Sequence, residues 1–425
     1  MHDDEDKSWQ SIIIGAGASV ILLLLAYFLM TTRSFTFNTG VPEKILQFDA
    51  VFVTGRKDGQ KIWEARAQNG WSNKNSVVTE LYNLTDGKSY KDGRLIMKNI
   101  KASYARYLRD AEVLVANKNP PEKPLFACPP ILQGDIDIGY YAETKAGQKK
   151  EEFSFFQSDS LKYFHKEKRS EIMGNILLRQ KDLWVKAEQM LVDHENKSAI
   201  IEDRARMKKG KISLTAQRLD FLAKTEEITA QNSVNAFIDE SERTRVKCNW
   251  LFIPTDKKQK RITMKDSIRV FQAKKAVRSD YAEYFEDKKE LNLFGRVVIF
   301  IQKGGDFFTL STLKRLDNPT AKEIAENKTT LWANRVVVST RTENATCEGQ
   351  VEVFQKEREA KADYAFYDDK EEKIWLWGNV YTKDKKDSRW LKADQVLVSV
   401  KEETFTALGS VESEFKIKTK RTMKK

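Results

Sequence analysis

The chain has 425 residues, with 74 lysines and arginines against 62 aspartates and glutamates, a net charge of +12 and an isoelectric point near 9.2. This length allows two domains or one elongated domain, and the charge favours a negatively charged partner. Acidic residues are interspersed with the basic ones along most of the chain, so a solvated lysine-rich surface explains the charge equally well. The three cysteines are an odd number, far apart and without metal-ligand spacing, which excludes a complete disulfide framework.

The first predicted element is a transmembrane anchor at residues 12–30. These nineteen residues carry no charge, which is long enough to span the hydrocarbon core of a bilayer. The tail before them, residues 1–11, is acidic rather than basic, and no small-residue cleavage site follows the apolar run. An uncleaved anchor is therefore favoured over a signal peptide. The lysines and arginines on its two flanks do not fix its orientation.

Short alternating runs separated by turn residues follow the anchor and predict an all-β body. We expect a first β domain within residues 31–116. Residues 117–130, "NKNPPEKPLFACPP", hold five of the eight prolines and are predicted to form a linker or a long loop. A short helical insertion is expected at residues 318–327, because Asn318 is suited to cap a helix that has Pro319 at its first position.

Residues 131–425 contain an internal repeat in which a polar residue precedes a glycine by fifteen positions. The pairs are Asp159 and Gly174, Asp280 and Gly295, Asn334 and Gly349, Asp363 and Gly378, and Asp394 and Gly409. Weaker copies have Asp203 or Asn232 at the glycine position, and one with two extra residues covers residues 249–266. Consecutive copies start 29 to 31 residues apart, a period typical of stacked units that share one continuous core.

The phase of the alternation in each copy predicts which face of the strands is buried. Residues two and four positions from the glycine are almost all apolar, whereas those at odd distances are mostly polar. Successive side chains of a strand point to opposite faces, so each unit is predicted to be two strands that share one inner face. The candidate residues on this face are Ile176, Leu291, Leu293, Val297, Ile299, Val336, Val338, Val351, Val353, Ile374, Leu376, Val380, Val396, Val398, Phe405 and Val411.

Trp375 and Trp377, in "KIWLWGNVYT", fall on the opposite, outer face. Two interpretations fit them. The indoles form cross-strand aromatic pairs that shield the outside of the sheet, or they are a contact surface for another protein.

No motif in the sequence predicts chemistry. The histidines have no metal-ligand spacing, the glycines stand singly within strands, and no Ser or Cys lies in a nucleophile motif. His194 is expected to be a solvated residue of a turn. We therefore expect no catalytic residue, no metal and no cofactor, and a protein that is not an enzyme. A membrane anchor also disfavours nucleic acid as a partner.

The repeat, of the type "ADYAFYDDKEEKIWLWGNV", resembles the OstA-like β-jelly-roll modules of the lipopolysaccharide-transport bridge. The stretch "FDAVFVTGRKDGQKIWEARAQNG", with Gly59, Trp63, Ala65 and Ala67, looks like the start of its membrane-anchored, LptC-like component. The resemblance implies an all-β, elongated, open twisted β-jelly roll of two-strand repeats after one N-terminal transmembrane helix. Residues 31–116 would be the LptC-like domain and residues 131–425 the OstA/LptA-like repeats, joined in one polypeptide.

The resemblance also implies a function. The protein would hold lipopolysaccharide, or a related glycolipid, by its acyl chains in a groove lined by the inner-face residues, and pass it from an inner-membrane ABC exporter toward the outer membrane. The anchor would cross the inner membrane once and the β body would lie in the periplasm, where other jelly-roll proteins would join it by edge-to-edge strand pairing. An acyl chain of a dozen carbons carries on the order of 10 kcal/mol against crossing water, so the cargo needs a continuous apolar trough.

Two other hypotheses remain. An anchored structural or adhesive β-repeat protein would have a solid core and no lipid cargo, and small inner residues such as Ala199 and Ala407 argue only weakly against it. An anchored enzyme acting on envelope glycans would need paired carboxylates in a cleft, whereas the acidic residues here fall mainly in turns and on outer faces.

Overall fold

The computed structural model describes residues 46–414, except 74, 123–126, 139–140, 144–148, 152, 223–226, 239–242, 256–259, 303–328 and 387–388. The predicted anchor at residues 12–30, its tail and the predicted helix at residues 318–327 lie outside the described residues. Within these residues no helix has the length and apolar character needed to span a membrane. The described part of the chain consists of strands, turns and irregular segments, so the all-β prediction is confirmed.

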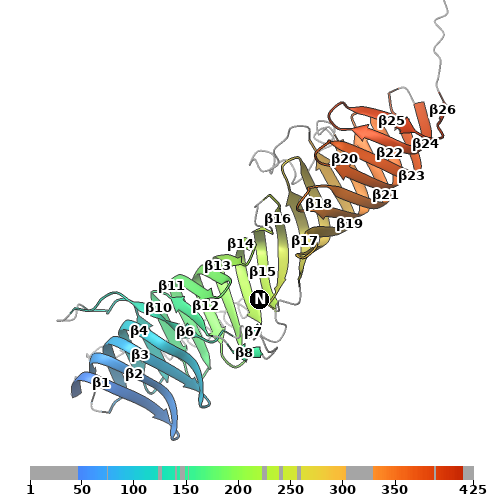
Figure 1. Cartoon of the computed structure of the whole chain (residues 1–425). Coiled ribbons are helices and arrows are strands. Elements are labelled where there is room, and N and C mark those ends of the chain that lie inside the picture. Colours follow the sequence, from blue (N-terminus) through green and yellow to red (C-terminus); the bar gives the residue numbers. More distant parts are fainter. Residues whose placement is uncertain are drawn as a thin grey trace, which may run out of the picture.

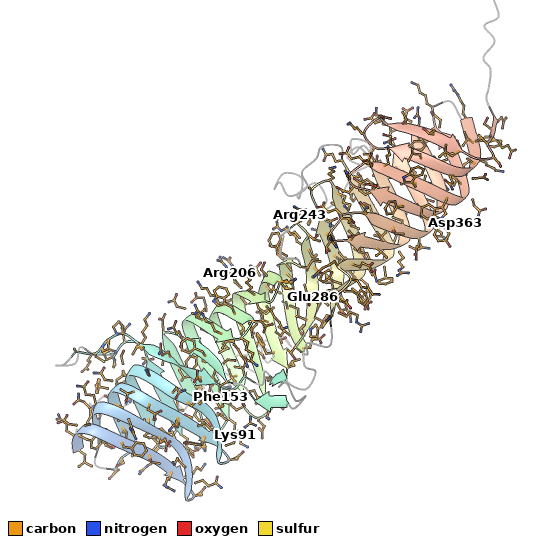
Figure 2. The ribbon with its side chains drawn as sticks, in the orientation of Figure 1. Lys91, Phe153, Arg206, Arg243, Glu286 and Asp363 are labelled. Carbon is orange, nitrogen blue, oxygen red and sulfur yellow. The ribbon has the colours of Figure 1, made fainter. Side chains whose placement is uncertain are left out.

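Twenty-six strands form within the described residues, and twenty-four of them belong to one sheet in which every pairing is antiparallel. The sheet forms an elongated body that runs from β1 at one end to β26 at the other (Figure 1), and the charged residues Lys91, Arg206 and Asp363 are spread along its length (Figure 2). The strands are β1 (Leu46–Lys57), β2 (Gln60–Ser72), β3 (Val78–Lys91), β4 (Arg94–Leu108), β5 (Val113–Asn117), β6 (Leu132–Ile136), β7 (Tyr141–Glu143), β8 (Lys149–Glu151), β9 (Ser154–Gln157), β10 (Ser160–Phe164), β11 (Arg169–Gln180), β12 (Leu183–Asp193), β13 (Ser198–Lys209), β14 (Ile212–Leu222), β15 (Glu227–Phe237), β16 (Arg245–Pro254), β17 (Arg261–Phe271), β18 (Lys275–Phe285), β19 (Glu290–Ile301), β20 (Thr329–Ser339), β21 (Ala345–Gln355), β22 (Arg358–Asp368), β23 (Lys373–Asp384), β24 (Arg389–Ser399), β25 (Thr404–Leu408) and β26 (Glu412–Glu414).

A β-bulge interrupts every second long strand of the repeat region, at the glycine position of the repeat. In β11, Gly174 and Asn175 face the single residue Glu188 of β12, and the register shifts by one at this point. Both bulge residues have positive φ, 76° and 48°. Asp203 and Asn232, which occupy the glycine position in the weaker copies, also have positive φ. A bulge bends its strand and increases the local twist, so a row of aligned bulges creases the sheet along its length.

The polar residue of each repeat lies directly over the bulge, which explains the fixed spacing of fifteen. Asn175 Nδ2 donates a hydrogen bond to Asp159 Oδ2 at 2.7 Å, and Asn379 Nδ2 donates one to Asp363 Oδ2 at 2.7 Å. A Cβ atom at Gly378 would lie 2.9 Å from the Cβ of Asp363. Positive φ and an overlying side chain together require glycine at this position.

The sheet folds over at the crease, so the two halves of each bent strand lie in two facing layers. The first layer contains residues 169–173 of β11 and the half-strands paired with them in turn, and the second layer contains residues 176–180 and their partners. Lys275, at the start of β18, and Asp369, just after the end of β22, are 3.0 Å apart (Nζ to Oδ1). In a flat sheet these opposite strand ends would be separated by about 36 Å along the strand direction alone, at ~3.3 Å per residue. The strand ends therefore meet along a line that we call the seam.

One continuous apolar cluster fills the space between the layers, from Ile62 in β2 to Val400 after β24. It passes the proline-rich segment without interruption. β5 and β6 both pair with β4. On their other sides, β5 pairs with β10 and β6 pairs with β9. β5 and β6 together therefore occupy the place of one long strand, and β9 and β10 together occupy the place of the next. The division of the chain into domains at residues 117–130 stays a prediction.

Candidate functional site

Fourteen of the sixteen predicted inner-face residues lie between the layers with at most 2% of their surface exposed. They all belong to the continuous apolar cluster. Phe405 is half-buried against this cluster, and Val411 is 50% exposed between β25 and β26. Val411 lies at the end of the body, where the three residues of β26 pair, among the described residues, only with Trp390, Leu391 and Lys392 of β24.

The inner-face residues form continuous rows across the strands. Leu293 of β19 is paired with Val336 of β20, and Leu376 of β23 with Val396 of β24. Neighbouring strands lie ~4.8 Å apart, so such rows make an apolar strip along the body rather than an isolated patch. These side chains are closed off from water between the two layers.

A buried lysine joins the two layers at the seam. Lys275 has no exposed surface, and its Nζ donates hydrogen bonds to Asp369 Oδ1 at 3.0 Å and to the carbonyl oxygen of Glu343. The ammonium group also lies 5.4 Å from the ring centroid of Tyr367. Burial lowers the pKa of Lys275, and the Asp369 carboxylate acts in the opposite direction. Burial also raises the pKa of the Glu343 carboxyl group.

Further ion pairs and a hydrogen bond cross the seam in the same sense. Lys274 Nζ lies 3.1 Å from Glu372 Oε1, Arg358 Nη1 donates to the carbonyl oxygen of Glu403 at 3.3 Å, and Lys356 pairs with the Glu403 carboxylate. In each case the cation lies at the strand ends of the second layer and the acceptor in a turn of the first layer. We call this set, together with Lys275, the seam contacts. Polar groups therefore hold the seam, while the interior behind it is apolar.

Near the N-terminal end of the body, the seam contains a buried histidine. His194 is only 6% exposed, its Nε2 lies 2.8 Å from Ser170 Oγ, and its carbonyl oxygen accepts a hydrogen bond from Lys91 Nζ at 3.0 Å. Burial lowers its pKa to about 4. The expectation of a solvated histidine was wrong, because the small Ser170 on the inner face leaves room for the ring and binds it.

The two tryptophans of β23 lie on the outer face. Trp375 is 38% exposed and Trp377 is 36% exposed. Trp377 stacks on Tyr364, its cross-strand partner in β22, with ring centroids 5.8 Å apart and planes inclined by 14°. Trp377 thus forms a cross-strand aromatic pair, and the role of this surface in contacting another protein stays a prediction.

The described residues contain no group of three or more His, Cys, Asp or Glu side chains that could hold a metal ion. Cys248 lies in the apolar interior, and burial raises the pKa of its thiol to about 12. The site therefore consists of the apolar interior and the polar groups that close it at the seam.

Comparison with known proteins identifies one matching family. The model of the family described as LptA/(LptD N-terminal domain) LPS transport protein matches residues 156–309 and 254–404, which together exceed half of the chain. Among solved structures, one similar chain is LptH, described as the LptA homologous periplasmic component of the conserved lipopolysaccharide transport device from Pseudomonas aeruginosa. It has 8% sequence identity and a TM-score of 0.14, and the similarity covers 48% of this chain and 95% of LptH. No curated protein matches the chain.

Proposed function

Because the chain belongs to the LptA/(LptD N-terminal domain) family of LPS transport proteins, we propose that it binds lipopolysaccharide, or a related glycolipid, between its two β layers. The observation that carries this proposal is the continuous apolar interior, to which strands from β2 to β24 contribute. Each buried CH2 group is worth ~0.8 kcal/mol, so a strip of this kind compensates an acyl chain for leaving its membrane along the whole path.

The proposal extends to the place of the protein in the cell envelope. Residues 12–30 anchor the chain in the inner membrane, the β body forms an open jelly roll in the periplasm, and the cargo passes from an inner-membrane exporter toward the outer membrane. The nineteen uncharged residues support the anchor. The protein acts by binding and transfer rather than as an enzyme.

The edge of the sheet supports pairing with other jelly-roll proteins. β1 is paired with β2, and among the described strands it has no neighbour on its other side. Leu46 and Phe52 on this strand are 52% and 56% exposed. An open edge of this kind is a template for a strand of another protein.

A second candidate function is a purely structural repeat, and the closed interior favours it. A solid core has no reason to open, whereas a lipid carrier must separate its layers. The two candidates therefore differ in whether lipid reaches the inner-face residues in the cell.

Site-specific photo-crosslinking in cells tests the proposal. A photoreactive residue is placed at Leu293, Val351 or Leu376, and Trp377 serves as the control because it neighbours Leu376 but faces outward. Glycolipid captured at the inner positions and not at Trp377 would support the carrier. A folded, anchored protein that captures no lipid at any inner position would favour the structural repeat.

A further inference from the structure

A hollow of about 400 Å³ lies beside the crease on the outer face of the second layer. Three consecutive strands each contribute an arginine to it: Arg269 from β17, Arg278 from β18 and Arg296 from β19. Trp332 of β20 and Asp280 of β18 also line the hollow. Buried Ile268 and Val270 flank Arg269 in β17, so the arginine points away from the interior. We call this feature the arginine hollow.

The strand register places like charges directly opposite each other at the arginine hollow. Arg269 is paired with Lys247 of β16 on one side and with Arg278 of β18 on the other. Like charges at directly opposite positions destabilise a sheet. At the equivalent cross-strand position further along the body, Lys361 of β22 is opposite Glu352 of β21, with Nζ and Oε1 3.0 Å apart. The fold itself therefore does not require adjacent cations at this position.

Two arginines and an indole of the arginine hollow offer N–H donors to a ligand. Arg278 has no carboxylate partner among the described residues. The guanidinium carbon of Arg296 lies 4.4 Å from the ring centroid of Trp332, a cation–π contact that leaves its N–H groups available. The indole Nε1 of Trp332 is buried and has no hydrogen-bond partner among the described residues, an arrangement that is costly unless a ligand supplies the acceptor.

The bulge motif is also altered here. At Gly174 and Gly378 the next residue is an asparagine that binds the overlying aspartate. At Gly295 the next residue is Arg296, and a Cβ on this glycine would lie as far as 3.9 Å from Asp280 Oδ2. The replacement adds a cation to the hollow.

We propose that the arginine hollow binds a phosphate group, carried either by a small phosphate compound or by the headgroup of a phospholipid or glycolipid. Guanidinium groups match phosphate oxygens with paired N–H donors, and the indole N–H adds a neutral donor. The hollow lies on the opposite side of the second layer from the apolar interior. The inference therefore stands apart from the proposed carrier function, and the failure of one leaves the other intact.

Two binding measurements distinguish a small phosphate compound from a lipid headgroup as the carrier of the phosphate group. Both use the full-length chain, in non-ionic detergent or reconstituted in vesicles. Equilibrium dialysis with radiolabelled inorganic phosphate, at constant ionic strength, tests the free ion. Capture of phosphatidylcholine vesicles with and without phosphatidic acid, a phosphate monoester headgroup, tests the lipid. Saturable binding of either probe supports the site and identifies its source, whereas the absence of both overturns it.

Matched variants test whether the arginine hollow is responsible. Arg278→Gln is expected to weaken binding about tenfold or more, because a charged hydrogen-bond donor is lost. Lys361→Gln, at the equivalent but compensated ladder position, should leave binding unchanged. Arg278→Gln breaks no ion pair with a described residue, so its urea midpoint should equal that of the unmodified chain. Equal losses of binding in both variants would show a general basic surface, and a lowered urea midpoint for Arg278→Gln would show a structural role; either result overturns the proposal.

Discussion

Replacing Asp369 with alanine should destabilise the C-terminal half of the body by about 3–5 kcal/mol at neutral pH, because it leaves the fully buried charge of Lys275 without its carboxylate. Lys275→Met should cost no more than about 1 kcal/mol. An apolar side chain of similar length fills the same space, and Asp369 keeps a second cation, Lys274, at 3.9 Å. The double variant should recover most of the stability that Asp369→Ala loses.

The pH dependence of Asp369→Ala provides a second readout of the same pair. Burial lowers the pKa of Lys275 below its ordinary 10.5, and Asp369 opposes that shift. Without Asp369, the folded chain binds fewer protons than the unfolded chain over a wider range below pH 10.5. The free energy of unfolding therefore rises with pH in that range, and the variant should regain stability toward about pH 10. Urea unfolding followed by tryptophan fluorescence measures this effect. The reasoning fails if Lys275→Met costs as much as Asp369→Ala, or if the double variant is no more stable than Asp369→Ala.

Three further predictions follow from the crease, the seam and the interior. Gly378→Ala should lower the urea midpoint more than Gly59→Ala. Both glycines have a φ of 78°, which strains an alanine by about 1 kcal/mol. Only at Gly378 does the new Cβ also contact Asp363, at 2.9 Å. Equal losses in the two variants would contradict this account of the crease. The unmodified chain should lose up to about 3 kcal/mol of unfolding free energy between about pH 6.5 and pH 4, because His194, with its pKa lowered to about 4, takes up its proton more readily when unfolded. His194→Gln should remove this loss. Acid titrations of the urea midpoint that coincide for the two proteins would argue against it. Cys248, with its thiol pKa raised to about 12, should react with a thiol reagent only after unfolding, and rapid labelling of the folded chain that is lost in Cys248→Ser would refute the burial.

The crease was predictable from the sequence because its determinants are local and periodic. Asp363 of β22 and Gly378 of β23 are fifteen residues apart because β23 follows β22 and pairs with it directly. The same arrangement of polar residue and glycine recurs along the chain. The alternation around Gly378 likewise placed Leu376 inside and Trp377 outside, as the structure has them. A period-two pattern fixes the face of a strand without knowledge of the tertiary structure.

The seam could not be predicted in this way because its contacts join distant turns. Lys275 and Asp369 are separated by 94 residues, and both lie in charged segments that resemble solvated turns in the sequence. Only the folding-over of the sheet brings the opposite ends of their strands together. The arginine hollow was missed for a related reason, because the Arg269–Arg278 pairing depends on the register across each bulge. His194 shows the same limit, since its burial depends on Ser170 in another strand.

The crease and the seam differ in a way that decides how the interior can open. At the crease each long strand of the repeat region crosses as continuous backbone, every second one through a bulge. Aspartates such as Asp159 and Asp363 lie over these bulges and accept hydrogen bonds from them. At the seam the layers meet through ion pairs and single hydrogen bonds, which water replaces at little net cost. Separating the layers there exposes apolar surface at about 25 cal/mol per Å². In the proposed carrier function, an incoming acyl chain would cover that same surface again. Opening at the seam with the crease as hinge is therefore the path of least free energy, and buried Lys275 is the point along it where separation costs most.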